Sequence, residues 1–465
     1  MLTSCGKKAD AALLLADNDR VLCYGELDEW VEANRQLLRK LPRPALAFQF
    51  APNSAGAVAT YLACLAEELP LGLGEPASMP RTRVIDAYLP SALILPEQEP
   101  APEEYELIGE MSGGELRLWR RCDGAYHVTP HRNLALLLAT SGSTGDAKFV
   151  RLSLANLLAN ARSIATYLGL GLGEIAIQSL PLHYSYGLSV LNSHLLAGAT
   201  VALTGHSFIR PEFWRVVDEC RCTSFAGVPY MYETLHRLRI IPTEHASLRT
   251  MTQAGGHLRV DFVRHFHEAA MERGARFFVM YGQTEATARI AFVPPERLSE
   301  KYESIGIAIP NGRLWLEGVH GEPAQHQLFY SGPNVMMGYA TGPADLVLGD
   351  EQGGILATGD LAECDGDGFF RLTGRMSRIA KLFGKRINLA GVEAEVEKVF
   401  STRTAILDGG DHLRVLLEGA DELAGTKARA YLADWLGVPP LAINVALIPQ
   451  IPLTASGKKD YKALA

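Results

Sequence analysis

Cysteine, excess positive charge and long apolar segments are all scarce in this sequence of 465 residues. The seven cysteines are odd in number and scattered, and the close pair Cys220 and Cys222 lacks the spacing of a zinc knuckle. The sequence therefore predicts buried free thiols instead of a disulfide framework. Lysine and arginine number 44 against 52 acidic residues, which argues against nucleic acid as the main partner.

Membrane-spanning and targeting patterns are missing as well. The first twenty residues contain no long apolar stretch of the kind found in a signal peptide. The most apolar segment, residues 55–66, runs into Glu67 and Glu68, well short of the roughly 20 residues that a membrane span needs. We therefore expect a soluble, cytoplasmic protein with no membrane span.

Short apolar runs alternate with segments of helical pattern from about residue 44 to residue 290. This alternation predicts strands joined by crossover helices, and hence largely parallel sheets covered by helices. The length predicts about two to four compact units. The predicted fold class is α/β, with a large N-terminal domain of helix-covered mixed sheets. Its ligands should bind at the carboxyl ends of the strands.

One helix is predicted with particular clarity, beginning after Ser153. Ser153 suits the N-cap position, and apolar side chains recur behind it at helical spacing. These are Leu154, Leu157, Leu158, Ala161, Ile164, Ala165 and Leu168. We expect the Gly/Ser-rich loop before this helix to join it to a strand at residues 134–139.

The rhythm changes after about residue 300 to shorter segments rich in turns, which predicts a small β region. Its Asp-Gly-Asp-Gly run at residues 365–368 indicates a hairpin. From Arg375 to the end, the pattern fits a compact α+β unit of about 90 residues. We therefore predict an N-terminal domain at 1–375 and a small C-terminal domain at 376–465.

The Gly/Ser-rich loop is the first candidate site. Backbone N–H groups at glycines, hydroxyl groups and one lysine are all suited to binding a phosphate. The loop consists of Thr140, Ser141, Gly142, Ser143, Thr144 and Gly145, followed by Lys148. Its spacing is not that of a P-loop, in which the lysine directly follows the second glycine. Taken alone, the segment is more typical of a solvent-exposed loop than of a phosphate site.

Two predicted strands end in candidate site residues. Gly255 and Gly256 leave one strand end without bulk, where a flat ring can approach. The next strand ends at Tyr281, whose ring can stack on a base, followed by the Thr284 hydroxyl and the Glu285 carboxylate. Glu285 is suited to holding Mg²⁺ on a polyphosphate, although a glutamate here can also cap a helix.

Two further polar residues lie near the C-terminus. Asp360 follows a glycine in "ATGDL" beside an expected turn, and its carboxylate can accept hydrogen bonds from two ribose hydroxyls. Lys458 lies in the polar segment "PLTASGKKDY". Each residue has an ordinary alternative, since an aspartate can stabilise a turn and a C-terminal lysine is usually solvated.

Taken together, these segments resemble the adenylate-forming enzyme superfamily, which includes acyl-CoA synthetases, luciferases and the adenylation domains of nonribosomal peptide synthetases. The motifs that carry the resemblance are "TSGSTGDAK", "QAGG", "YGQTEA", "TGD", "GRMSRIAK" with "GKRINLAGVE", and "PLTASGKKD". The resemblance extends over nearly the whole chain. It implies a large N-terminal domain, a small mobile C-terminal domain, and activation of a carboxylic acid by ATP and Mg²⁺ to an acyl-adenylate and pyrophosphate.

The resemblance also implies roles for individual residues. The loop from Thr140 to Lys148 would hold the β- and γ-phosphates. The catalytic set would be Lys458, which bridges the carboxylate and the α-phosphate, with Thr284 at the α-phosphate and Glu285 at the metal. The remaining nucleotide-binding residues would be Gly255, Gly256, Tyr281, Gly282, Gln283, Asp360 at the ribose and Arg375 beside it.

The sequence departs from the family pattern at three places. Ala147 replaces a usual proline, which loosens the loop without deleting a ligand. Phe149 stands where many relatives have glycine. The hinge after Gly374 and Arg375 usually begins with an acidic residue or a lysine, whereas this chain has Met376, Ser377 and Arg378.

The segment "LPLHYSYGLSV" narrows the class of carboxylic acid that we expect as substrate. Amino-acid-activating relatives place an aspartate there to pair with the ammonium group, and this segment contains no carboxylate. A buried ammonium without a counter-charge is costly, so we expect an acyl or aryl acid instead of an α-amino acid. The expected substrate-pocket residues are His183, Tyr184, Gly227, Val228 and Gly255. His183 can equally be a packed loop histidine, and Phe225 and Tyr230 can be pocket wall or plain core.

The expected function is an acid-thiol ligase that passes the acyl group to coenzyme A or to the phosphopantetheine of a separate acyl carrier protein. A basic cluster of Lys381, Lys385 and Arg386 can bind a 3′-phosphate of coenzyme A or form a solvated face. Two alternatives remain. One is transfer to an amine, which forms an amide, and the other is a nonenzymatic nucleotide or acyl-adenylate sensor.

Overall fold

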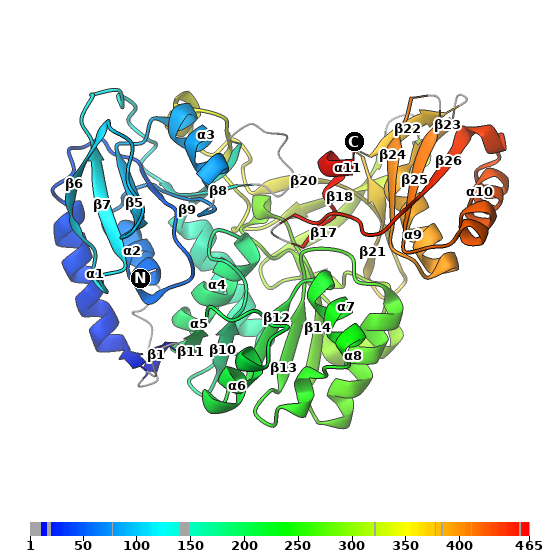
Figure 1. Ribbon diagram of the computed structural model, residues 1–465, viewed down its shortest axis with the longest axis horizontal. Helices are drawn as coiled ribbons and strands as arrows, with labels where there is room; N and C mark the ends of the chain where they lie inside the picture. The colour runs from blue at the N-terminus through cyan, green and yellow to red at the C-terminus, as the bar shows by residue number, and fades with distance from the viewer. Residues whose placement is uncertain are drawn as a thin grey trace.

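The computed structural model describes most of the chain. The described residues are 11–15, 20–76, 78–139, 148–319, 322–376, 378–382, 385–410, 412–454 and 457–464. They form three lobes around a common centre, two of which are built on large sheets (Figure 1). Among these residues, no helix combines the length and the apolar character needed to cross a bilayer.

The first large sheet has nine strands, and its central strands are parallel, as the alternating pattern predicts. Helices pack on it from the crossover connections. In spatial order the strands are β16 (Ile307–Ala308), β15 (Ala291–Phe292), β14 (Arg276–Tyr281), β13 (Thr250–Gln253), β12 (Ser224–Gly227), β10 (Ile175–Gln178), β11 (Thr200–Leu203), β1 (Ala11–Leu15) and β2 (Arg20–Cys23).

The second large sheet has eight strands and is mixed, with parallel pairs at its centre and antiparallel pairs toward both edges. In spatial order its strands are β19 (Gly338–Ala340), β9 (Phe149–Ser153), β8 (Leu134–Ala139), β4 (Leu71–Leu73), β3 (Ala47–Gln49), β5 (Ala92–Pro96), β7 (Leu116–Arg121) and β6 (Tyr105–Glu110).

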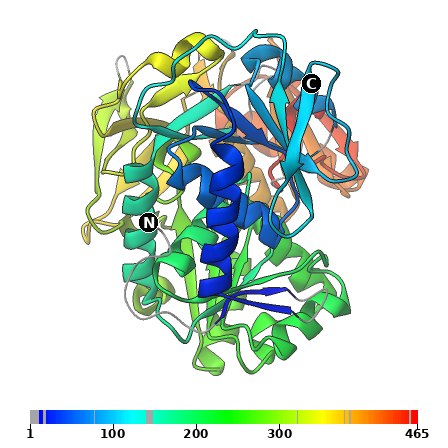
Figure 2. The ribbon, with the colours of Figure 1, turned by 90° about the vertical axis from the view of Figure 1, so that its left-hand side faces the viewer.

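Eight α-helices of the described residues belong to these two lobes. They are α1 (Tyr24–Leu38), α2 (Ala55–Ala66), α3 (Ser78–Tyr88), α4 (Leu154–Leu168), α5 (Ser185–Leu196), α6 (Pro211–Glu219), α7 (Pro229–Leu238) and α8 (Val260–Glu272). The long helix α1 crosses the outer side of the molecule (Figure 2). Helix α2 is buried almost throughout and contributes many of its side chains to the main apolar core.

Helix α4 begins as the sequence predicts, because the Ser153 hydroxyl accepts a hydrogen bond from the backbone N–H of Asn156 and caps its first turn. The connection before it was predicted incorrectly. The Gly/Ser-rich loop does not join a strand directly to this helix, since β9 intervenes and pairs antiparallel with β8. Strand β9 is stabilised on its other edge by β19, a partner far along the chain.

A four-stranded antiparallel sheet forms the predicted small β region. Its strands are β17 (Arg313–Val319), β18 (Glu322–Ser331), β20 (Ile355–Cys364) and β21 (Phe370–Arg375). Strands β20 and β21 form the hairpin predicted at residues 365–368. Asp360 lies within β20 instead of beside a turn, directly after Gly359, whose φ of +72° bends the strand.

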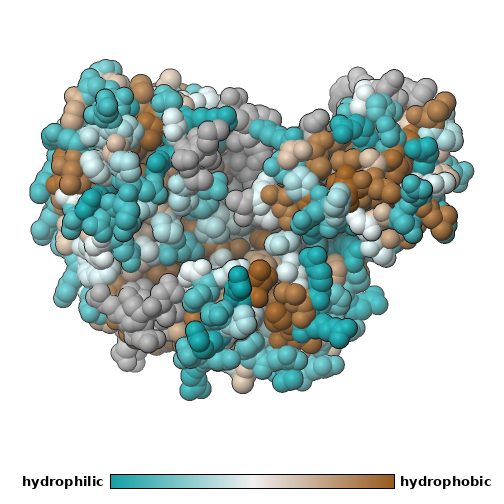
Figure 3. Space-filling view, viewed as in Figure 1, coloured by the Kyte–Doolittle hydropathy of each residue, from teal (hydrophilic) through white to brown (hydrophobic). Residues whose placement is uncertain are grey.

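The C-terminal part of the chain stands out as a separate lobe, divided from the rest by a notch in the space-filling view (Figure 3). Its own apolar core includes Leu382, Val396, Val415 and Leu432. Its elements are β22 (Ile379–Leu382), β23 (Lys385–Asn388), α9 (Leu389–Phe400), β24 (Thr404–Asp408), β25 (Leu413–Glu418), α10 (Glu422–Leu436), β26 (Ile443–Ile448) and α11 (Tyr461–Leu464).

The two sides of the proposed hinge are anchored in different bodies. The backbone N–H of Met376 donates to the Gly359 carbonyl in β20 at 2.8 Å. The Arg378 guanidinium bonds the Glu393 carboxylate of α9 at 2.7 Å and the Tyr461 hydroxyl at 2.9 Å. Ser377, between these anchors, lies outside the described residues. This pattern supports the proposed division into 1–375 and 376–465.

Candidate functional site

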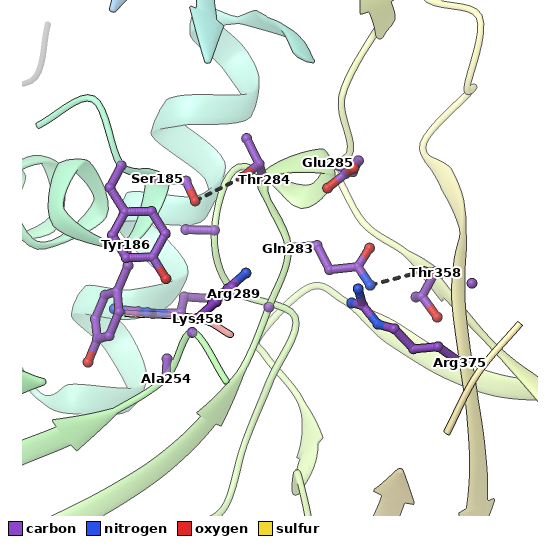
Figure 4. A pocket seen from close by; sticks show the side chains of 15 residues that line it. Ser185, Tyr186, Ala254, Gln283, Thr284, Glu285, Arg289, Thr358, Arg375 and Lys458 are labelled. Atoms are coloured by element: carbon purple, nitrogen blue, oxygen red, sulfur yellow. Dashed lines mark hydrogen bonds between the residues drawn. The ribbon is translucent and has the colours of Figure 1, made fainter. Parts of the chain in front are cut away.

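A pocket lies where ends of β13 and β14 meet β20, β21 and the C-terminal lobe. Polar side chains from these separate elements point into it (Figure 4). The lining residues are Tyr184, Ser185, Tyr186, Ala254, Gly255, Gly282, Gln283, Thr284, Glu285, Ala288, Arg289, Thr358, Gly359, Arg375 and Lys458. The pocket therefore brings together residues that the sequence separates by as much as 274 positions.

The phosphate-binding candidates are only partly placed. Thr140, Ser141, Gly142, Ser143, Thr144 and Gly145 lie outside the described residues, as does Ala147. Lys148 is described, and its Nζ lies 3.5 Å from the centre of the Tyr339 ring. The Tyr339 hydroxyl donates to the Glu285 carboxylate at 2.9 Å. One tyrosine ring thus connects the lysine at the end of this loop with the proposed metal ligand.

The segment after β14 is shaped by a close backbone contact. A Cβ atom at Gly282 would lie 1.6 Å from the Ala288 carbonyl oxygen, so only glycine fits there. Two residues after Gly282, the Thr284 hydroxyl lies 3.1 Å from the Ser185 hydroxyl at the start of α5. This contact fixes Thr284 on the pocket wall.

Asp360 is the centre of a hydrogen-bond cluster and is only 1% exposed. Its carboxylate accepts from the Gln283 amide at 2.8 Å, from the Arg375 Nε at 2.5 Å and from the Tyr281 hydroxyl. The charge of Asp360 raises the pKa of Arg375, and burial followed by that same charge raises the pKa of Tyr281 well above its ordinary value. Asp360 is therefore held as an acceptor by two residues of the lining, Gln283 and Arg375, and is not itself among the residues that line the pocket.

Tyr281 contributes to the hydrogen-bond cluster around Asp360 through its hydroxyl. Its ring is 8% exposed and is not among the residues that line the pocket. Gly256 also lies off the lining, with Pro229 3.2 Å from where its Cβ would stand. Thr358 and Gly359 also line the pocket, although neither was expected there from the sequence. They reach it because strand β20 bends at Gly359 and presents its backbone to the pocket.

Lys458 enters the pocket from the C-terminal lobe. Its neighbour Gly457 has a φ of +76°, and Val228 lies 3.0 Å from where a Cβ of Gly457 would stand. Burial, and secondly the charge of Arg375, lower the pKa of Lys458 to about 8, while Glu285 and Asp360 act in the opposite direction. The ammonium group of Lys458 therefore loses its proton near pH 8, well below the range of an ordinary lysine.

The expected acid pocket is built around Tyr184. The Tyr184 hydroxyl lies 2.3 Å from where a Cβ of Gly255 would stand, and Gly255 has a φ of +89°. Val228 lies 3.3 Å from that same position. Gly227 packs against the Tyr232 ring behind the wall. His183 does not line the pocket, and burial lowers its pKa to about 4, so it is neutral near pH 7.

Arg289 is a charged residue of the lining for which no role was expected from the sequence. It is 2% exposed, lines the pocket and lies with its guanidinium 3.9 Å from the centre of the Tyr186 ring. A single arginine five residues after Thr284 carries no local signal of burial. Phe225, by contrast, belongs to the apolar core beneath the wall, and Tyr230 is only packed against that core.

The pocket fits ATP and Mg²⁺ chemically. Among the described residues no group of three or more histidine, cysteine, aspartate or glutamate side chains could hold a metal ion. Among the described residues that line the pocket, Glu285 is the one carboxylate, and the cations Arg375 and Lys458 line the same pocket. Mg²⁺ is commonly held by one or two carboxylates together with substrate phosphates, which is the donor set available here.

Comparison with protein families finds a match to the AMP-binding enzymes over residues 79–340, more than half of the chain. The feruloyl-CoA synthase of an Amycolatopsis species is 30% identical over 383 residues, which cover 77% of this chain and 76% of that protein. The medium-chain fatty-acid–CoA ligase of Escherichia coli is 26% identical over 377 residues, covering 77% and 62% of the two chains.

Solved structures agree on the fold. The o-succinylbenzoate CoA synthetase of Bacillus subtilis, in complex with its acyl-adenylate intermediate, has a TM-score of 0.76 at 20% identity and covers 98% of this chain and 95% of that one. The amide bond synthetase of Marinactinospora thermotolerans also has a TM-score of 0.76, at 23% identity, with coverage of 98% and 96%.

Proposed function

The chain belongs to the AMP-binding enzymes, and from that premise we propose that it joins an acyl or aryl acid to AMP with release of pyrophosphate and then transfers the acyl group to the thiol of coenzyme A. One observation carries the proposal. Lys458 reaches from the C-terminal lobe into the same pocket as Thr284, Glu285 and Arg375. An adenylating enzyme needs this combination of a movable cation, a metal ligand and a nucleotide site.

The chemistry of the first step follows from these residues. One oxygen of the substrate carboxylate forms a bond to the α-phosphorus, and the bond from that phosphorus to the bridging oxygen of the β-phosphate breaks. Pyrophosphate leaves and no proton is transferred. Lys458 stabilises the negative charge that builds up between the carboxylate and the α-phosphate, and Thr284 donates to an α-phosphate oxygen.

The other polar residues position the nucleotide. Asp360 accepts hydrogen bonds from the ribose hydroxyls, and Arg375 and Gln283 keep its carboxylate in place. Glu285 would hold Mg²⁺, which when bound neutralises charge on the phosphates. Lys148 lies beside Tyr339, close to the phosphate side of Glu285.

An α-amino acid is a poor fit to this pocket. Glu285 is the single carboxylate on the described lining and is assigned to the metal, so a substrate ammonium would have no counter-charge of its own. Arg289, which also lines the pocket, adds a further positive charge to it. These charges support an acyl or aryl acid.

For the second step, coenzyme A is the proposed acceptor because the AMP-binding relatives with high coverage include CoA-forming ligases. The side chains of Lys381, Lys385 and Arg386 lie outside the described residues, so the 3′-phosphate cluster stays a prediction. The phosphopantetheine of a separate carrier protein offers the same thiol.

The test is exchange of labelled pyrophosphate into ATP with Mg²⁺ and a panel of acids, without coenzyme A. Acid-dependent exchange by the parent and its loss in Lys458→Ala would support the proposal. ATP binding without exchange for any acid would favour a nucleotide sensor. Product analysis with coenzyme A or an amine then separates a thioester from an amide.

A further inference from the structure

Arg289 carries a buried positive charge that has no acidic partner in the described part of the chain. Its side chain is 2% exposed, and its Nε atom has no hydrogen-bond partner. Among the described residues, no carboxylate oxygen comes within 4.0 Å of its guanidinium. A buried charge without a partner is costly, and proteins retain one where a ligand supplies the missing partner.

The backbone holds Arg289 in place at a cost in strain. Thr287 and Ala288, just before it, have φ angles of +64° and +156°, which residues with a side chain rarely adopt. Asn334 secures this turn. Its side-chain amide donates to the backbone carbonyl of Arg289 at 3.0 Å, and its backbone carbonyl accepts from the Thr287 hydroxyl at 2.6 Å. Strain maintained by such contacts is typical of a functional position.

The described side chains that interact with the Arg289 guanidinium are aromatic, and Tyr186 is also hydrogen-bonded to it. The guanidinium lies over the Tyr186 ring at 3.9 Å, and its charge also acts on the neighbouring Tyr184. A cation over a ring gains about 2 kcal/mol or somewhat more when desolvated, whereas burying an unpaired charge costs several kcal/mol. The aromatic contact alone therefore does not compensate for the burial.

Arg289 belongs to the acid side of the pocket. Its guanidinium lies over the Tyr186 ring, and the centre of that ring is 6.2 Å from the centre of the Tyr184 ring, which belongs to the expected acid pocket. Lys458 enters the same pocket from the C-terminal lobe. The pocket thus has one cation at the reacting carboxylate and another beside the expected acyl group.

We propose that Arg289 binds a second carboxylate of the substrate, so that the enzyme activates dicarboxylic acids at one end only; this inference rests on the adenylation proposed above. Lys458 takes the carboxylate that reacts, and Arg289 pairs with the carboxylate that does not. A monocarboxylic acid leaves the Arg289 guanidinium unpaired and is bound more weakly.

The experiment compares matched acids by pyrophosphate exchange with the full-length protein. The pairs are glutarate with pentanoate, adipate with hexanoate, and terephthalate with 4-methylbenzoate. For at least one pair we expect the dicarboxylate to have a kcat/KM at least about 30-fold above that of its partner. Arg289→Met should abolish this preference, and Arg289→Lys should retain part of it.

A matched control is Arg215→Met, which removes an exposed arginine of α6 that lies outside the pocket lining. It should keep the parent preference. The inference is overturned when the parent activates the monocarboxylates as well as the dicarboxylates, or when Arg289→Met keeps the preference. The acid comparison on the parent decides the question even where Arg289→Met fails to fold. Absence of exchange with every acid would overturn the adenylation proposal itself.

Discussion

The pKa of Lys458 gives the sharpest prediction for the proposed chemistry. Burial and the charge of Arg375 lower it from 10.5 to about 8, which corresponds to about 3 kcal/mol of free energy against the ammonium form. A lysine is charged below its pKa, so the charge needed for adenylation is present below pH 8 and is lost above it. We expect kcat/KM to fall about tenfold per pH unit above pH 8, because kcat/KM reports the free enzyme.

Bound substrates should raise the pH at which Lys458 loses its charge. The triphosphate and the acid carboxylate place negative charge beside Lys458, which favours its ammonium form and raises its pKa. The alkaline limb of kcat, which reports the enzyme–substrate complex, should therefore lie at higher pH than that of kcat/KM. The assay is pyrophosphate exchange from pH 6.5 to 10, with the acid limiting in one series and saturating in the other.

Lys458→Ala should slow exchange by about 10²–10³-fold, and the residual rate should lack the limb near pH 8. Lys462→Ala is the matched control, since Lys462 is an exposed lysine on the same C-terminal segment and should leave the rate unchanged. The reasoning would be refuted by a Lys458→Ala variant that is as fast as the parent, or one whose residual rate keeps the same limb.

Three further changes test other parts of the site. Gly255→Ala should lower the free energy of unfolding by roughly 1–3 kcal/mol and raise KM for the acid, because the new Cβ would meet the Tyr184 hydroxyl at 2.3 Å; chemical denaturation and kinetics check this. Asp360→Asn should weaken ATP binding at least about 30-fold by calorimetry, because the Arg375 guanidinium loses its charged partner; unchanged affinity would remove Asp360 from the nucleotide site. Glu233→Gln should loosen the C-terminal lobe, since Glu233 of α7 pairs with Arg403 just before β24, and small-angle scattering should show a larger radius of gyration.

The local motifs of the site could be predicted from the sequence because each follows a strand or a turn with its own signature. Thr284, Glu285 and Lys458 lie in motifs whose residue types suit phosphate and metal chemistry, and the structure brings them into one pocket. The helix after Ser153 was predicted from its N-cap and its apolar spacing. These signals are local, so they can be read without knowing the tertiary structure.

The errors and omissions share a physical cause, which is dependence on distant partners. Strand β9 contains Arg151, a poor candidate for a buried strand, and is stabilised by pairing with β19 and by an ion pair between Arg151 and Glu351. Tyr339 approaches Lys148 and Glu285 only because β19 joins that sheet. Nothing near these residues in the sequence indicates such contacts.

The short turn from Gly282 to Arg289 has a consequence for changing the selectivity of the enzyme. Glu285, assigned to the metal, and Arg289, assigned to the acid, lie four residues apart in one turn, closed by the contact between Gly282 and Ala288. An insertion or deletion there would shift the metal ligand together with the acid contact. Acceptance of new acids is therefore best sought by exchanging the Arg289 side chain alone, with the length of the turn kept constant.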